Sequence, residues 1–238
     1  MKFRLLFLTL ILATPIRSQT LQLHYELRHS MEPARYERDF PQLYFEYFKG
    51  TDAGSFQLKM QSDFTGEKSN IGQFYLQVSK NLRFWKPAIF LQVQYSGGLG
   101  ISEPGSYGYY IRNAFSAGPS YPFRWNDAWC NAFVSYTFNA LERPSHDILC
   151  SFYWGKGFWD YFVEFTGDIQ FWTLNKDQGP VSGAGEGGKR FYFYGEPQIW
   201  FNIDATFALG SKLNLYYHVL TNDGVFQAFP TLAVRYKP

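Results

Sequence analysis

Two sets of residues have the side-chain types that catalysis needs, and neither has the spacing. Ser145-His146-Asp147 contains the residue types of a hydrolytic triad, but a triad is assembled in space and not from three consecutive residues. We interpret this run as a solvated turn. Glu164 and Asp168 would lie about 13 Å apart on one face of a strand, beyond the ~5–9.5 Å of a glycosidase carboxylate pair. The spacings therefore predict no catalytic residue.

The histidines likewise give no sign of a metal site. His24, His29, His146 and His218 do not recur at the short intervals that bring ligands onto one ion. We expect no metal and no cofactor, and the sequence favours a protein that is not an enzyme.

Polar and apolar residues alternate along much of the chain. In Ser55–Phe64, Phe56, Leu58 and Met60 alternate with residues such as Lys59 and Asp63. Side chains of a strand point to opposite faces at every second residue, so this segment predicts a strand with one polar and one apolar face.

The same pattern predicts twelve strands, and no segment has the 3.6-residue apolar period of a helix. Their approximate ranges are 20–28, 41–49, 55–64, 71–82, 87–96, 108–119, 127–139, 146–154, 159–174, 190–203, 211–221 and 226–237. Tight connections are expected at Gly50–Gly54, Arg83–Lys86, Phe123–Asn126 and Gly155–Gly157, and long ones at His29–Phe40, Gly97–Tyr107 and Asn175–Lys189. Short turns at one end and long loops at the other are typical of an outer-membrane barrel.

The N-terminal residues have the layout of a secretory signal peptide. A basic segment, Met1–Arg4, precedes an apolar run, Leu5–Ala13, and a plausible cleavage site before Gln19. An anchor helix is the alternative, but the apolar run is short for a bilayer. We predict a signal peptide over 1–18 and a single barrel domain over 19–238.

Composition gives no indication of a nucleic-acid-binding protein. Removal of residues 1–18 takes three of the 22 basic residues and leaves 19 against 20 acidic ones. A net charge near −1 provides no basic face, so we expect no nucleic-acid partner.

The choice between a membrane barrel and a soluble β-sandwich depends on the aromatic residues, which make up 21% of the chain. They gather near the expected strand ends, as at Tyr109-Tyr110 and Phe123–Trp125, where rings suit the bilayer interface. We therefore predict an all-β, transmembrane, antiparallel up-and-down barrel in the outer membrane of a Gram-negative bacterium. Its expected partners are outer-membrane lipid and the barrel-assembly machinery. An exported β-sandwich is the alternative.

The two cysteines, Cys130 and Cys150, fall on neighbouring predicted strands. A disulfide bridge and two free thiols both remain open at this point.

Twelve strands enclose a narrow lumen that the barrel's own side chains partly fill. Strand parity predicts the inward, solute-facing residues, which include Glu26, Arg28, Tyr44, Glu46, Lys59, Asp63, Tyr75, Glu164, Asp168, Trp172, Glu196, Trp200, Tyr216 and His218. Such residues could stack a flat solute and hydrogen-bond its edges. The alternative is a salt-bridged network that only satisfies the interior.

Two segments carry a family resemblance. LYFEYFKGTDAGSFQLKMQSDF, at Leu43–Phe64, resembles the early hairpin of the Tsx-like channel superfamily. Together with the opening LQLHYELRHS, it is more similar to a Bacteroidetes-type family called domain of unknown function 5020, grouped with those channels. The resemblance implies a narrow twelve-stranded channel permeable to nucleosides, with Glu46 and Asp63 at its acidic positions. The C-terminal Tyr236-Lys237-Pro238, which does not end on an aromatic residue, departs from the pattern of many barrels.

These observations predict an outer-membrane channel or binding barrel for small polar solutes, such as a nucleoside. An outer-membrane lipid hydrolase is one alternative, although the chain has no run of His, Ser and Asn-Gly facing lipid. A soluble exported β-domain that binds a ligand is the other.

Overall fold

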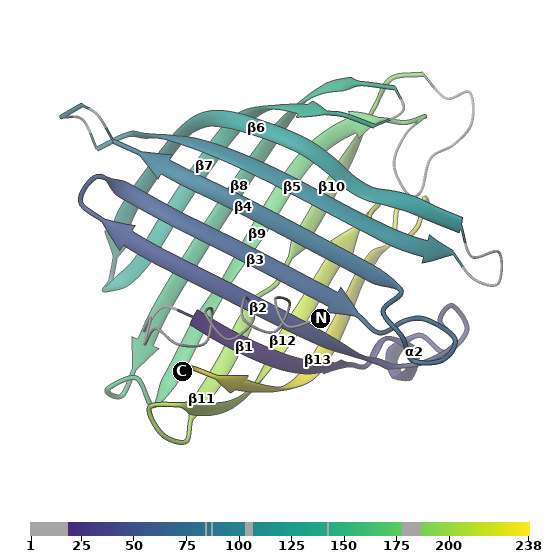
Figure 1. The fold of residues 1–238 in the computed structure, drawn as a ribbon, viewed down its shortest axis with the longest axis horizontal. Helices are drawn as coiled ribbons and strands as arrows, with labels where there is room; N and C mark the ends of the chain where they lie inside the picture. Colours follow the sequence, from purple (N-terminus) through teal and green to yellow (C-terminus); the bar gives the residue numbers. More distant parts are fainter. Residues whose placement is uncertain (1–18, 84, 87, 103–106, 142, 178–186) are drawn as a thin grey trace, which may run out of the picture.

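The strands form one antiparallel sheet that closes on itself. The computed structural model describes residues 19–238 except 84, 87, 103–106, 142 and 178–186, so the predicted signal peptide lies outside the described residues. Each strand pairs with its neighbours in the chain, except that β10 and β11 both pair with β9 and β12, and the last strand pairs with the first through a register that joins Leu21 to Tyr236. The result is a closed barrel of strongly tilted strands (Figure 1), which confirms the predicted fold class.

Each predicted segment contains a strand, and several strands run longer than predicted. Their bounds are β1 (Gln19–Glu26), β2 (Phe40–Thr51), β3 (Gly54–Asp63), β4 (Gln73–Leu82), β5 (Phe90–Ser102), β6 (Tyr107–Trp125), β7 (Ala128–Asn139), β8 (Ser145–Phe158), β9 (Val163–Asn175), β10 (Lys189–Gly195), β11 (Gln198–Asn202), β12 (Phe207–Tyr217) and β13 (Phe226–Tyr236). A single helical turn, α2 (Arg28–Met31), lies between β1 and β2. Among the described residues, no helix is long and apolar enough to cross a bilayer.

The thirteen strands fill twelve positions because β10 and β11 are two parts of one interrupted strand. Both pair with β9 and with β12, and Gly195 opposite Ile169 and Gln198 opposite Thr166 belong to the same register. The interruption falls at Glu196-Pro197. Proline has no N–H to donate to the ladder, so regular pairing stops there.

Gly167 on β9 lets the chain pass close to this interruption. Its φ is +157°, and a Cβ there would lie 2.8 Å from both Glu196 O and Pro197 Cα. Only glycine fits this approach without a backbone shift.

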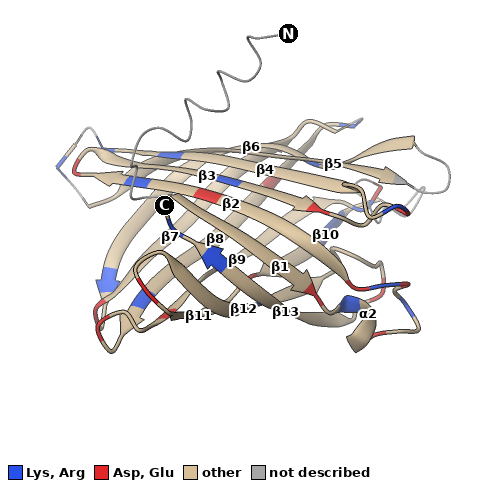
Figure 2. Ribbon diagram, turned by 60° about the horizontal axis from the view of Figure 1, so that its bottom comes forward, with Lys and Arg blue, Asp and Glu red and all other residues tan. Residues whose placement is uncertain are grey.

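The polarity of the barrel is the reverse of that of a soluble domain. The inward positions are polar and almost completely buried, as at Gln22 (2% exposed) and His24 (0%) on β1. The outward positions are apolar and exposed, as at Leu23 (54%) and Val134 (52%). Lys, Arg, Asp and Glu occupy only a small part of the strand ribbon (Figure 2). A β-sandwich buries its apolar faces against each other, so the sandwich alternative is excluded. An apolar outer band suits lipid.

Exposed aromatic residues gather at both ends of this band. At the end with the short turns they are Trp125, Trp129, Phe158, Trp159, Phe207 and Tyr236, and at the end with the long loops they are Tyr107, Tyr110, Phe191 and Phe226. Two aromatic girdles are typical of barrels that span a membrane.

Several predicted connections are wrong because the strands are longer than the alternation indicated. Gly155–Gly157 lie within β8, Phe123–Trp125 within β6, and Gly97–Ser102 within β5, where a bulge shifts the register between Gly98 and Leu99. Ser145-His146-Asp147 opens β8, and Asp147 is buried inside the barrel. The interpretation of that run as a solvated turn is therefore wrong.

The two cysteines are free thiols. Cys130 on β7 lies opposite Trp154 and Cys150 on β8 lies opposite Val134, so the register does not place them against each other.

We expect Val134→Arg to destabilise the folded barrel by about 2–4 kcal/mol, because Val134 lies near the middle of β7 on the lipid side. Equilibrium urea unfolding in phospholipid vesicles measures this, with Val134→Leu as the control. A change within about 0.5 kcal/mol is what a water-exposed site gives and would contradict the membrane assignment.

Gly167→Ala should cost about 1–3 kcal/mol, since the added Cβ strains the backbone at the β10–β11 interruption. Gly155→Ala on the neighbouring strand is the matched control, because its Cβ would meet nothing nearer than Thr166 Cγ2 at 3.7 Å. The same unfolding experiment compares the two, and equal stabilities would refute the role given to Gly167.

Candidate functional site

An ion-pair network, here called the central bridge, crosses the middle of the barrel. It consists of Lys59, Asp168, Glu196 and Lys212. β3 and β9 are six positions apart in either direction around the twelve-position ring, so they face each other. Lys59 Nζ on β3 contacts Asp168 Oδ1 on β9 and lies 2.8 Å from Glu196 Oε1. One side chain thus joins opposite walls.

The two carboxylates of the central bridge lie side by side, Asp168 on β9 and Glu196 at the β10–β11 interruption next to it. Glu196 N donates to Asp168 O at 2.9 Å, which holds the two residues side by side. Like charges on neighbouring strands repel each other. Lys59 offsets this repulsion from across the lumen, and Lys212 Nζ lies 3.8 Å from Glu196 Oε2 on the other side.

Neutral donors complete the coordination of these carboxylates. The hydroxyls of Tyr44 and Tyr194 donate to Glu196 at 3.2 and 2.9 Å, and Gln170 Nε2 donates to Asp168 at 3.0 Å. Buried charges persist in proteins when they are paired and hydrogen-bonded in this way.

The interior is filled at the level of the central bridge. Asp168 and Lys212 are 0% exposed and Gln77 is 1% exposed. Residues that line a wide aqueous channel would keep contact with water, so the side chains themselves occupy this part of the lumen.

A second cluster lies toward the long-loop end around Arg28. Its Nη2 is 2.5 Å from Glu26 Oε1, and Asn214 Nδ2 donates to Glu26 Oε2 at 3.0 Å. The guanidinium carbon lies within 5.0–5.6 Å of four aromatic centroids, those of Tyr36, Phe40, Tyr216 and Phe229. Cation–π contacts of this kind add to the ion pair with Glu26 in holding the charge. Asp63, a second carboxylate that acts on Arg28 through space, accepts from Gln61 Nε2 at 2.8 Å.

The connection that carries α2 is tied to β13 and to the adjacent β12–β13 loop. Gln227 Nε2 donates to Glu32 at 3.0 Å and to Tyr36 Oη at 2.8 Å. Arg35 Nη1 lies 2.7 Å from Asp223 Oδ2. The nearby Thr221 hydroxyl and the hydrogen bond from Arg35 hold the pKa of Asp223 below its ordinary value. These contacts fix the β1–β2 loop against the β12–β13 loop.

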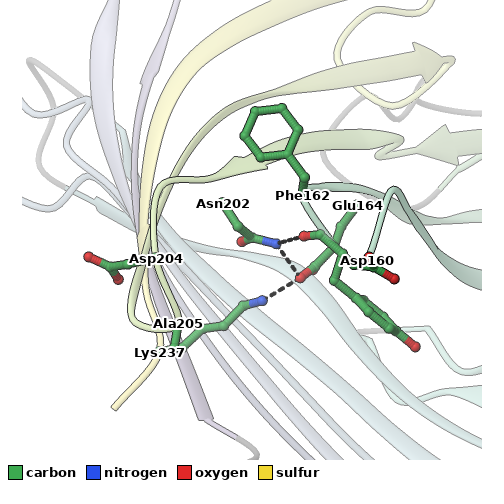
Figure 3. A pocket seen from close by; sticks show the side chains of 8 residues that line it. Asp160, Phe162, Glu164, Asn202, Asp204, Ala205 and Lys237 are labelled. Carbon is green, nitrogen blue, oxygen red and sulfur yellow. Dashed lines mark hydrogen bonds and ion pairs between the residues drawn. The ribbon is translucent and has the colours of Figure 1, made fainter.

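A pocket of roughly 630 Å³ opens at the short-turn end (Figure 3). At its wall, Glu164 accepts from Lys237 Nζ at 2.6 Å and Asn202 Nδ2 at 2.8 Å, and pairs with Arg235 at 2.8 Å. Arg235 also lies 4.5 Å from the Trp200 ring centroid. A carboxylate held by two cations is fully engaged, so the pocket presents a polar mouth and no free acid or base from this group.

The structure brings the predicted residues together in three groups. Tyr44, Lys59, Asp168 and Glu196 form the central bridge and its donors; Glu26, Arg28, Tyr216 and Asp63 form the Arg28 cluster; and Glu164 meets Trp200 through Arg235. Tyr75 and Trp172 are on inward positions nearer the long loops, and Glu46 accepts from Gln57 Nε2 at 2.8 Å. His218 is the exception, because β12 ends at Tyr217 and His218 lies in the following loop.

Parity reasoning also missed interior residues. Lys212 alternates with apolar residues in its segment, so the sequence pattern was sufficient to predict that it faces the lumen. Arg112 and Asp147 lie in segments without regular alternation, so the pattern assigns them no face. Within the described ranges no group of three His, Cys, Asp or Glu side chains is arranged to hold a metal ion.

Comparison with known proteins places the chain in a family. Residues 18–237 match the family described as Domain of unknown function (DUF5020). The chain belongs to this family. No curated protein matches the DUF5020 chain.

Two solved structures share the fold of this DUF5020 protein. The "KdgM porin" has a TM-score of 0.50 and 6% identity, with 91% of this chain and 98% of that chain covered. The "NanC porin" structure has a TM-score of 0.52 and 10% identity, with 93% and 100% covered. At such identities the likeness shows the barrel architecture.

In this DUF5020 protein we expect Lys59→Met to cost about 3–5 kcal/mol of unfolding free energy, because it leaves two adjacent buried carboxylates without the cation between them. The triple variant Lys59→Met/Asp168→Asn/Glu196→Gln should recover most of the loss. Urea unfolding in vesicles measures both, and a single variant as stable as the wild type would show that the bridge contributes nothing.

Proposed function

We propose that this protein is a narrow outer-membrane channel or binding barrel for small polar solutes, and that it is not an enzyme. The observation that carries the proposal is a polar, aromatic-lined interior inside a closed barrel whose outer side is apolar. Such an interior offers hydrogen-bond partners to a solute that leaves water, while the outer side keeps the barrel in lipid.

The central bridge obstructs the middle of this proposed pathway. Lys59 connects the two walls, so a solute passes only when its ammonium group leaves Asp168 and Glu196. Because the bridge is made of side chains and not of a folded plug, a rotamer change of Lys59 is the smallest motion that opens it. The barrel would conduct poorly at rest.

A nucleoside is the solute class that the resemblance of the Leu43–Phe64 hairpin to Tsx-like channels supports. The interior contains both kinds of group that a nucleoside requires. Tyr44, Tyr153 and Tyr194 present rings and hydroxyls, and Gln77 and Gln170 present amides that can donate and accept. Export to the Gram-negative outer membrane by way of the barrel-assembly machinery belongs to the same proposal.

Lys59→Ala should raise the single-channel conductance in planar bilayers at least several-fold, since it removes the side chain that crosses the lumen. Lys80→Ala, on an outward-facing position of β4, is the control and should leave conductance unchanged. Liposome swelling in uridine then tests the solute. If wild type and Lys59→Ala both admit neither ions nor uridine, and uridine causes no thermal shift, the proposed function is wrong.

A further inference from the structure

Arg112 lacks the carboxylate partner that Lys59, Arg28 and Arg235 have in the interior. Arg112 on β6 extends across the long-loop half of the lumen to β9, where its guanidinium carbon lies 4.6 Å from the Trp172 ring centroid. Two strands, β7 and β8, separate β6 from β9 along the sheet. Arg112 therefore projects into the passage itself.

Two nitrogens of Arg112 have no hydrogen-bond partner among the described residues. Its Nε and Nη2 are buried and make no hydrogen bond, and the ion pairs formed within the described part of the chain do not include Arg112. Arg28 is paired with Glu26 at 2.5 Å, and Arg235 with Glu164 at 2.8 Å. A guanidinium has five N–H donors and no acceptor, and its unpaired buried N–H groups are costly.

The carboxylate that acts on Arg112 through space is already engaged. Asp147 accepts from Asn139, Ser145 and Thr173 at 2.8, 2.5 and 2.9 Å. It also pairs with Lys189 Nζ at 2.7 Å. The other titratable groups that act on Arg112 are Tyr75 and Tyr153. Lys189 balances the charge of Asp147, so the charge of Arg112 remains uncompensated.

The aromatic groups beside Arg112 determine which part of it can bind. Trp172 stacks on Tyr192 with centroids 5.4 Å apart and an interplanar angle of 11°. The Trp172 ring thus contacts both Tyr192 and the guanidinium. The Trp172 ring contacts the flat face of the guanidinium, so the N–H groups at its edge remain available to bind a ligand. Those edges match two oxygens of a carboxylate or a phosphate.

We propose that Arg112 is the binding residue for a solute that carries an oxyanion, either a carboxylate or a phosphate, in the long-loop vestibule. The inference rests on the proposed function and narrows its solute class. A neutral nucleoside would not use Arg112, whereas a nucleoside monophosphate or a sugar acid would.

The test compares matched pairs of solutes that differ only in the oxyanion. Binding of uridine, uridine monophosphate, glucose and glucuronate to the detergent-solubilised full-length protein is measured by calorimetry and by tryptophan fluorescence. We expect uridine monophosphate, glucuronate or both to bind at least ten-fold more tightly than the neutral partner. Arg112→Gln should weaken that binding about ten- to a hundred-fold. Arg112→Lys should fall between the two, because it keeps the charge and loses the fork.

Arg143→Gln is the matched control. It removes one positive charge at the same end of the barrel, but the Arg143 side chain is 74% exposed and pairs with Asp177 in the loops. It should leave binding unchanged. Melting temperatures of all variants separate a packing role from a binding role, since a packing role lowers the stability of Arg112→Gln without changing the preference for oxyanions.

Each outcome decides the inference. If only uridine monophosphate binds more tightly than its neutral partner, the site is for phosphates, and if only glucuronate does, the site is for carboxylates. If both do, Arg112 forms a general oxyanion site. Equal binding of charged and neutral partners by the wild type overturns it, even if Arg112→Gln fails to fold. Uridine uptake without any oxyanion preference overturns this inference and leaves the proposed function intact. If the barrel binds oxyanions but conducts no ions, the Arg112 site is supported and the channel function is rejected.

Discussion

Closure of the backbone hydrogen-bond ladder is the constraint from which the other features follow. Lipid offers no partner to an N–H or C=O group, so every spanning strand needs a neighbour on both sides. Pairing of β13 with β1 supplies the last neighbour. Even the interruption at Pro197 keeps the register of β10 and β11, and nearby groups such as Glu196 N and Pro197 O still find partners on β9 and β12. A sheet closed in this way has an outer and an inner face, and the outer face contacts lipid.

The inner face must then satisfy its charges within a narrow space. Most interior cations do so by pairing across or along the wall, as Lys59 and Arg235 do. Burying these charges costs desolvation free energy, which ion pairs with carboxylates and contacts with aromatic rings offset. Arg112 departs from this rule, and the exception stands in the vestibule and not in the filled middle. At the centre, Lys59 and Lys212 both lie within ion-pair distance of a carboxylate, although Lys212 Nζ makes no hydrogen bond. At one entrance, Arg112 has no carboxylate partner among the described residues, and this difference is consistent with a passage that attracts a ligand before it opens.

The sequence alone was sufficient for the strand pattern and the inward faces. Lys59, Asp168 and Glu196 were predicted to face the lumen because a period of two assigns a face to every residue. It assigns neither depth along the axis nor partner, so the contact of Lys59 with Asp168 on β9, six positions away, could not be predicted. Ser145-His146-Asp147 was misjudged because a polar run usually marks a turn, whereas here polar residues occupy the interior. Gly155–Gly157 were predicted to form a turn because glycine is common in turns, whereas β8 continues through them. His218 was predicted to face the lumen, but it follows the end of β12, and the alternation of side chains does not indicate where a strand ends.

The seam between β1 and β13 has a consequence for biogenesis. These strands are farthest apart in sequence, yet Leu23 and Val234 are direct partners. Until the final segment arrives, β1 keeps an open edge, which is a template for pairing with other chains. Contacts of such long sequence separation also form slowly. A newly synthesised chain therefore needs protection from aggregation for the whole interval between emergence of its first strand and delivery of its last.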